Sequence, residues 1–155
     1  MNDTPVITET APQRVAKIHL CVPREQIMQV MGPGIQEVYA ALAAQGIAPA
    51  GPWLTYHHQR PDAEFDFDIC VPVASAVAPT GRVVAGELPA ERVARTVYHG
   101  GYEGLGQAWG EHIAWVSEQG LPAKSQLWEV YAEGPERGGP PSSWRTELNQ
   151  PLENP

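Results

Sequence analysis

The chain has 155 residues, 43% of them hydrophobic and 18% charged, which suits a globular protein with a real core. Its formal net charge of −8 argues against a nucleic-acid surface and mildly favours cationic ligands. The sequence has no apolar run of the roughly 18 residues that a membrane span needs, and its polar start is not a secretory signal. Because Cys21 and Cys70 have no cysteine-rich or histidine-rich company, we expect a cytoplasmic protein without disulfides.

The first third of the chain predicts a strand followed by a helix. Residues 1–12 contain two prolines and three threonines, and we expect a flexible lead-in there. Residues 14–22 are rich in β-branched side chains and predict the first strand. Residues 24–31 suit one or two helical turns, but Gly32-Pro33-Gly34 should interrupt them, since proline cannot continue the hydrogen-bond ladder. Pro33 would begin a new helix, which Gly46 stops.

Two strands are expected next. Residues 53–57 predict a short strand, and residues 58–64 a loop. Residues 65–73, FDFDICVPV, alternate clearly between apolar and polar positions, which is typical of a half-buried strand. Its polar face carries Asp66, Asp68 and Cys70. The small residues 74–80 read as a connector between two halves of the protein.

The rest of the chain has a similar order. It predicts strands at 81–88 and 92–99, an amphipathic helix at 102–119, a strand at 126–133, a mobile loop at 134–141, a last strand at 144–148 and a tail at 149–155. Sequence similarities support an internal repeat: residues 14–17 with 92–95, 53–56 with 128–131, and 65–73 with 144–152. In this register Tyr56 corresponds to Tyr131 and Leu54 to Glu129.

The repeat predicts an α+β fold of tandem β-α-β-β units. We expect one domain over residues 13–152, made of halves 13–73 and 81–152. Its antiparallel sheet would carry two helices on one face and a ligand cleft on the other, with a groove where the halves meet. The two tyrosines Tyr56 and Tyr131 would line this groove from both sides.

Glu129 is the most informative polar residue of the second half. Along a strand at 126–133, Trp128 and Val130 point one way, and Glu129 and Tyr131 point the other. We expect the carboxylate and the phenol on the face that does not pack against the helix. That face is either a ligand cleft with Glu129 at its charged base or an ordinary exposed sheet face, since exposed glutamates are common.

Five motifs resemble those of the GyrI-like small-molecule-binding domains, which include the effector-binding domains of BmrR- and Rob-type regulators. They are GPWLTYHH (51–58), FDFDICVPV (65–73), VYHGGYEGLGQAW (97–109), LWEVY (127–131) and WRTELNQPL (144–152). The resemblance implies a cleft that binds lipophilic, often cationic compounds, with Glu129 meeting the cation and Tyr56 and Tyr131 at aromatic positions. Residues 1–12 cannot hold a helix-turn-helix, so we expect a stand-alone version that does not contact nucleic acid.

These considerations predict a set of ligand-binding residues: Glu129, Tyr131, Tyr56, Leu54, Tyr98, Tyr102 and Trp109. The helical pattern by itself favours Trp109 as a core residue of the second helix rather than a cleft residue. Some stand-alone relatives resemble hydrolases that open cyclopropane-bearing genotoxins. In that alternative Glu129 and Tyr131 would act on an electrophilic xenobiotic, because a desolvated carboxyl suits a general acid or base. A third alternative is an inhibitory module that binds a protein partner, and a homodimer is also compatible with the sequence.

We expect neither a cofactor nor a metal. His57-His58 is a pair of possible metal ligands, but no third ligand accompanies it at helical or hairpin spacing. Gly100-Gly101-Tyr102-Glu103-Gly104 is not a phosphate loop, because no Lys-Ser or Lys-Thr follows it.

Overall fold

The computed structural model describes residues 2–134 and 139–153. The chain divides into two compact units. Unit 1 consists of Met1–Thr10 together with Glu91–Pro155, and unit 2 is the continuous stretch Ala11–Ala90. Each unit combines antiparallel strands with one long helix, so the fold is of the mixed α+β class that the sequence predicts.

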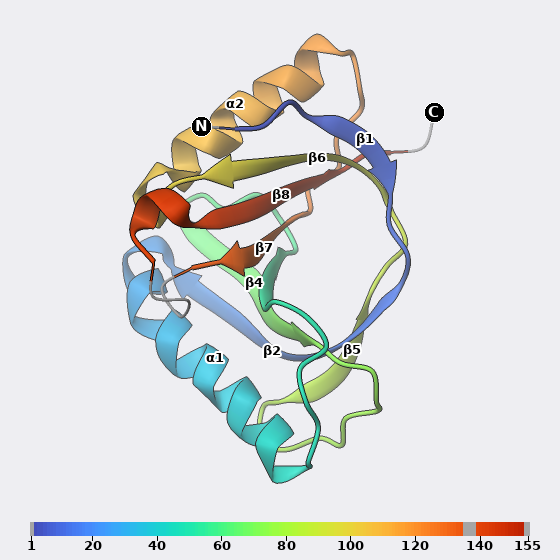
Figure 1. Cartoon of the computed structure of the whole chain (residues 1–155), viewed down its shortest axis with the longest axis vertical. Helices are drawn as coiled ribbons and strands as arrows, with labels where there is room; N and C mark the ends of the chain where they lie inside the picture. The colour runs from blue at the N-terminus through green and yellow to red at the C-terminus, as the bar shows by residue number, and fades with distance from the viewer. Residues whose placement is uncertain (1, 135–138, 154–155) are drawn as a thin grey trace. The chain divides into compact units, whose positions relative to one another are not determined.

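Unit 2 holds four strands in the order β3-β4-β2-β5 (Figure 1). Their bounds are Gln13–Pro23 for β2, Leu54–His57 for β3, Glu64–Pro72 for β4 and Val84–Leu88 for β5. All neighbouring strands of this unit pair antiparallel. After the short 3-10 turn η1, Arg24–Gln26, helix α1 spans Ile27–Ala44.

The two faces of the unit 2 sheet differ in chemistry. Ile18 on β2 and Ile69 on β4 lie directly opposite each other and pack with Val38 of α1 in a fully buried cluster. Because side chains alternate along a strand, His19 and Asp68 are also opposite each other but on the face away from α1. This second face of unit 2 therefore carries the polar positions of both strands.

Helix α1 runs without a break through Pro33, which lies inside it. The predicted interruption at Gly32-Pro33-Gly34 is therefore wrong. The reason is visible at Gly34: a Cβ there would come within 2.6 Å of the Cδ1 of Ile69, so the helix backbone lies directly on the core of the sheet. Tertiary packing of the helix compensates for the hydrogen bond that proline removes.

Unit 1 holds four strands in the order β1-β6-β8-β7. Their bounds are Val6–Glu9 for β1, Arg92–His99 for β6, Leu127–Glu133 for β7 and Arg145–Pro151 for β8. Helix α2, Leu105–Glu118, follows the 3-10 turn η2, Tyr102–Gly104, and lies along β6 (Figure 1); a further turn, η4, spans Pro141–Ser143. The helix buries Ala108 against Leu148 of β8, and Val116 against Ala94 of β6.

Several boundaries differ from those that the sequence predicts. Residues 6–9 form β1, which pairs with β6, where a flexible lead-in was expected. The last strand continues to Pro151 rather than ending at residue 148. The strand predicted at 81–88 is observed as β5, but it pairs with β2 and thus belongs to unit 2, so the observed division of the chain differs from a boundary at 74–80. The mobile loop predicted at 134–141 falls largely on residues 135–138, outside the described residues.

Both predicted helix ends are confirmed. Gly46 and Gly120 each have φ of 68°, in the left-handed region where a helix commonly terminates. Within residues 2–134 and 139–153, no helical segment combines the length and the apolar composition that a membrane span requires.

Candidate functional site

Glu129 lies in the middle of β7, on the side of the sheet that α2 covers. It is directly opposite Leu148 of β8, and Leu148 packs against α2. Glu129 and Tyr131 share a face, as the sequence predicts, but the expectation that this face points away from the helix is wrong. Alternation shows which side chains share a face, and the apolar Trp128 and Val130 suggested the opposite orientation of the strand.

The carboxylate of Glu129 is buried and hydrogen-bonded through both oxygens. Tyr131 donates its hydroxyl hydrogen to Oε1 at 2.7 Å, and Trp109 of α2 donates its indole N–H to Oε2 at 2.6 Å. Glu129 is only 9% exposed and Tyr131 only 5%. Hydrogen bonds to a carboxylate are among the stronger ones in proteins, and inside an apolar region they hold its position firmly.

Aromatic rings continue outward from this carboxylate. Tyr102, at the start of the turn before α2, meets Tyr131 edge to face with 5.7 Å between ring centroids. The Tyr102 ring also packs against Trp144, with 5.0 Å between the ring centroids. We call Trp109, Glu129, Tyr131 and Tyr102 the Glu129 cluster. It brings together two residues of β7, Glu129 and Tyr131, with Tyr102 of η2 and Trp109 of α2, and three of the four are aromatic.

Tyr98 is part of the core of unit 1. It packs with Leu148 and Ala108, and its hydroxyl donates to the Gly101 carbonyl at 2.8 Å. A Cβ at Gly104 would overlap that hydroxyl, so glycine is required where the turn passes over the ring. Tyr98 supports the turn that carries Tyr102, and its predicted role in ligand binding stays a prediction.

The predicted residues of unit 2 lie on β3. Leu54 is buried and opposite Cys70, while Tyr56 is opposite Asp68, so both are on the face away from α1. The Tyr56 ring meets the His58 ring edge to face at 5.4 Å. These placements leave their predicted role in ligand binding untested.

The strand pairing corrects the register of the internal repeat at this point. Thr55 lies opposite Ile69, just as Glu129 lies opposite Leu148, and both pairs face the helix of their own unit. The structural counterpart of Glu129 is therefore Thr55, one residue away from the predicted Leu54. His57 then corresponds to Tyr131, and its ring bonds Thr55 Oγ1 at 3.2 Å much as Tyr131 bonds Glu129.

His57 is buried and stacks on Phe67, with 5.3 Å between ring centroids and 21° between the planes. Burial lowers the pKa of His57 from its ordinary 6.5 to about 4, because a charged imidazole is poorly solvated there, and nearby His58 adds to this effect. At neutral pH, then, the position equivalent to Tyr131 holds an uncharged ring, and unit 2 has no carboxylate at the position of Glu129.

A separate hollow of about 510 Å³ lies at the N-terminal side of unit 1. It is lined by Asn2, Asp3, Thr4, Pro5, Glu111, His112 and Trp115. The lining includes His112, whose Nε2–H donates to the Ala94 carbonyl at 2.8 Å, and burial lowers the pKa of this histidine. None of the predicted ligand-binding residues lines this hollow.

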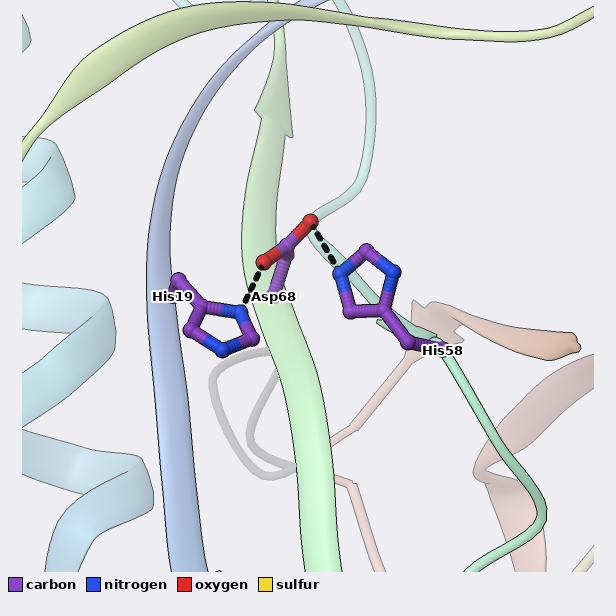
Figure 2. Close-up of side chains that lie close together, drawn as sticks. All are labelled: His19, His58 and Asp68. Carbon is purple, nitrogen blue, oxygen red and sulfur yellow. Dashed lines mark hydrogen bonds and ion pairs between the residues drawn. The ribbon is translucent and has the colours of Figure 1, made fainter.

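Sequence reasoning missed a second polar cluster, formed by His19, His58 and Asp68 of unit 2 (Figure 2). No third ligand accompanies His57 and His58 at helical or hairpin spacing, because these three residues meet across paired strands. The sequence feature that could have indicated this cluster is the alternation of apolar and polar residues in both strands. It places His19 and Asp68 on the polar faces of their strands.

Solved structures with a similar fold support the assignment of the fold class. The EcmrR C-terminal domain has a TM-score of 0.85 and 22% identity, with 98% of each chain covered. In an EcmrR–DNA complex the chain spans only 58% of the EcmrR protein. SAV2435 bound to tetraphenylphosphonium has a TM-score of 0.66 at 15% identity, with 98% of this chain and 95% of that one covered. A hydrolase from Listeria innocua has a TM-score of 0.69 at 12% identity, with 96% and 91% covered.

No curated protein sequence matches the chain. The model of one protein family, described as GyrI-like small molecule binding domain, matches residues 3–153, which is nearly the whole chain. With the motifs at 51–58, 65–73, 97–109, 127–131 and 144–152 and the fold described above, this match places the chain in a family: it belongs to the GyrI-like small molecule binding domains.

Proposed function

We propose that the protein binds lipophilic cations, with the carboxylate of Glu129 as the anionic group that recognises them. The observation that carries this proposal is a buried carboxylate that Trp109 and Tyr131 both contact, with the ring of Tyr102 packed against Tyr131. A buried carboxylate is costly unless a positive charge or hydrogen bonds compensate it. A lipophilic cation would add both a counter-charge and cation–π contacts of about 0.5–2 kcal/mol each.

The geometry of the cluster favours a ligand that carries charge without hydrogen-bond donors. Each carboxylate oxygen of Glu129 already accepts a hydrogen bond, from Trp109 or from Tyr131, so the ligand need only supply the positive charge. A quaternary ammonium or phosphonium ion needs no hydrogen bond and can approach ring faces and carboxylate together. The tetraphenylphosphonium complex of SAV2435, a structural neighbour, supports this choice of ligand class. The net charge of −8 adds a weak attraction for cations.

The test is a titration of the protein with tetraphenylphosphonium and with the neutral triphenylphosphine oxide, followed by tryptophan fluorescence. Trp109 is a built-in reporter, because its indole N–H bonds Glu129. We expect saturable binding of the cation, weakened about tenfold or more in Glu129→Gln by loss of the charge, and unchanged binding of the neutral compound. Glutamine has nearly the same shape, so the cluster should keep its packing.

Glu133→Gln is the matched control. Glu133 is on the same strand, but its carboxylate is 39% exposed and lies 3.8 Å from Arg145 at the surface. Its removal makes the same change in net charge and should leave cation affinity within about twofold. Equal weakening by the two substitutions would mean that only the overall charge matters, and would contradict a role for Glu129 as the recognition group.

A hydrolase is the second candidate, favoured by the Tyr131 hydroxyl on Glu129 and by neighbours from Listeria innocua described as hydrolases. In this alternative Glu129 would align or activate water, and Tyr131 would orient an electrophilic substrate such as a cyclopropane-bearing compound. Product analysis separates the two functions. A hydrolase should lose turnover in Glu129→Gln while still binding substrate, whereas a binding protein yields no product in either form.

A further inference from the structure

Three strand-borne side chains of unit 2 converge on one point, away from the Glu129 cluster. His19 comes from β2, Asp68 from β4 and His58 from the residue that follows β3 (Figure 2). The backbone N–H of His58 donates to the Asp66 carbonyl at 2.9 Å, which fixes the start of the loop against β4. The strand pairing, rather than a flexible loop, therefore sets the positions of all three side chains.

The ligating atoms of these residues are close enough to share one ion. Nδ1 of His19 is 2.9 Å from Oδ1 of Asp68, and Nε2 of His58 is 3.0 Å from Oδ2. All the atoms that could ligate lie within 4.8 Å of one another. A tetrahedral ion bound at about 2.0–2.2 Å separates its ligand atoms by about 3.4 Å, so small side-chain rotations would convert this cluster into a coordination site.

The surroundings resemble the outer shell of a metal site. The second ring nitrogen of His19, Nε2, lies 3.1 Å from Oδ1 of Asp66, within ion-pair distance although not aligned as a hydrogen bond. A histidine that binds a metal through one nitrogen commonly turns its other N–H toward a carboxylate, which orients the ring and raises its basicity. Asp66 is placed to do this for His19.

Burial and exposure fit an ion that enters from solvent. The Asp68 side chain is only 4% exposed and supplies the buried anionic ligand, while the His19 and His58 side chains are 55% and 40% exposed. Two imidazoles and one carboxylate form a ligand set that suits zinc and neighbouring first-row divalent ions and leaves a coordination position for water. Hard cations such as magnesium prefer oxygen ligands alone.

The ammonium group of Lys17 disfavours metal binding at this site. Its Nζ lies 3.3 Å from Oδ2 of Asp68, the oxygen that also contacts His58. An ammonium group there neutralises part of the negative charge and repels a divalent ion. The Lys17 side chain is 31% exposed, so it can swing into solvent when an ion arrives.

We propose that His19, His58 and Asp68 form a binding site for a divalent transition-metal ion of the zinc class. Nδ1 of His19, Nε2 of His58 and a carboxylate oxygen of Asp68 are the protein ligands, and Asp66 orients His19. The site is independent of cation recognition by Glu129, and the two can be tested separately.

The experiment uses the full chain, stripped of metal with a chelator, and titrates it with Co²⁺ by visible absorption and with Zn²⁺ by calorimetry. The background is Cys21→Ser, because Cys21 is an exposed thiol two residues beyond His19 and could bind metal by itself. Cys70 can stay, since it is buried and burial raises the pKa of its thiol far above the ordinary range. We expect one ion per chain and an absorption spectrum typical of nitrogen and oxygen ligands.

Substitutions locate the ion. His58→Ala and His19→Ala remove exposed rings and should preserve folding, which circular dichroism checks; each should weaken Zn²⁺ binding by about 100-fold or more. Asp66→Asn should weaken it by about 10- to 100-fold, as for other outer-shell partners. Lys17→Met should strengthen it, which a merely structural hydrogen-bond network around Asp68 would not do.

His99→Ala is the matched control. His99 is also an exposed histidine that lies 2.9 Å from a carboxylate, Asp3, but it belongs to unit 1. Its substitution should leave affinity unchanged. Absence of saturable one-to-one binding in the parent protein, or equal weakening by His99→Ala and His58→Ala, would overturn the proposal and leave the cluster as a set of partners for a buried aspartate.

Discussion

His57 shows how a single buried residue connects packing to pH. Its ring stacks on Phe67 and meets Phe65 edge to face at 5.9 Å, and its Nε2 bonds Thr55. A protonated imidazole would bring charge into this aromatic layer, which is why burial lowers the pKa to about 4. The residue therefore behaves as an aromatic core side chain at neutral pH, and its protonation destabilises the folded state in acid.

This gives a prediction for stability. Because the unfolded chain has a His57 pKa near 6.5 and the folded chain one of about 4, the unfolded state binds more protons between these values. The free energy of unfolding should therefore fall as pH is lowered from 6.5 towards 4, by up to about 3 kcal/mol from this residue. Urea unfolding at about pH 7 and pH 4.5 measures this change. The loss of unfolding free energy between the two pH values should be smaller in His57→Gln than in the wild type. His99→Gln, an exposed control, should retain the full loss, and a loss of the same size in all three proteins would refute the assignment to His57.

Helix α1 offers a matched pair of glycines at the scale of one element. A Cβ at Gly32 meets nothing within 4 Å, whereas a Cβ at Gly34 meets Ile69 at 2.6 Å and Ile18 at 3.3 Å. Both glycines lie in the helix interior, where glycine costs about 1 kcal/mol relative to alanine. Gly32 comes directly before Pro33, whose ring disfavours the helical conformation of a preceding residue that carries a Cβ. Alanine therefore gains less helix propensity at Gly32 than at Gly34, while only the Cβ at Gly34 meets a crowded core.

We expect Gly32→Ala to keep the free energy of unfolding within about 1 kcal/mol of the wild type, because the gain in helix propensity is opposed by crowding between the new Cβ and the Pro33 ring. The free energy of unfolding of Gly34→Ala should be about 1–3 kcal/mol lower than that of Gly32→Ala. This is the usual cost of overpacking, because the ends of two buried isoleucines must move. Chemical denaturation of the two variants measures the difference directly. Equal free energies of unfolding for the two variants would show that α1 can shift away from the sheet at no cost.

Elements and their order follow well from local patterns, while faces and partners do not. The strand at 65–73 and the helix stops at Gly46 and Gly120 were predictable, because alternation and glycine conformation are local properties. The face of Glu129 was not, because a shift of one residue along β7 exchanges the two faces of the strand. His19 and Asp68 meet through the pairing of β2 with β4, a contact that no spacing along the chain reveals.

At the scale of the whole molecule, each of the edge strands β1 and β5 pairs with a strand of the other repeat. Each repeat of the sequence can be extended by one strand at its start, β1 before the first β-α-β-β unit and β5 before the second. These two strands are exchanged in the structure: β1 pairs with β6 of the second repeat, and β5 pairs with β2 of the first. Unit 2 is therefore one continuous stretch, Ala11–Ala90, whereas unit 1 needs two separate pieces of chain. Thr10 reinforces the joint of unit 1, where its N–H donates to the Glu91 carbonyl at 2.8 Å.

This connectivity predicts different behaviour for fragments. Residues 11–90 contain every strand of the unit 2 sheet and all of its core cluster, so we expect this fragment to fold and unfold cooperatively. Residues 91–155 lack β1, which leaves the edge of β6 unpaired, and we expect them to remain poorly ordered. Joining residues 1–10 to the end of 91–155 by a flexible linker should restore order. Circular dichroism and thermal melting of the three polypeptides provide the measurement, and well-ordered 91–155 alone would contradict it.

The exchanged edge strands also determine the order in which the two units can fold during translation. Residues 1–10 leave the ribosome before unit 2, yet β6, the strand that pairs with β1, is made more than 80 residues later. Unit 2 is complete once residue 90 has emerged, while the remainder takes on the order of several seconds at usual translation speeds. A nascent chain therefore holds a complete unit 2 and an N-terminal segment whose partner strand is still missing. Chaperones and proteases encounter this intermediate before Glu129 has left the ribosome.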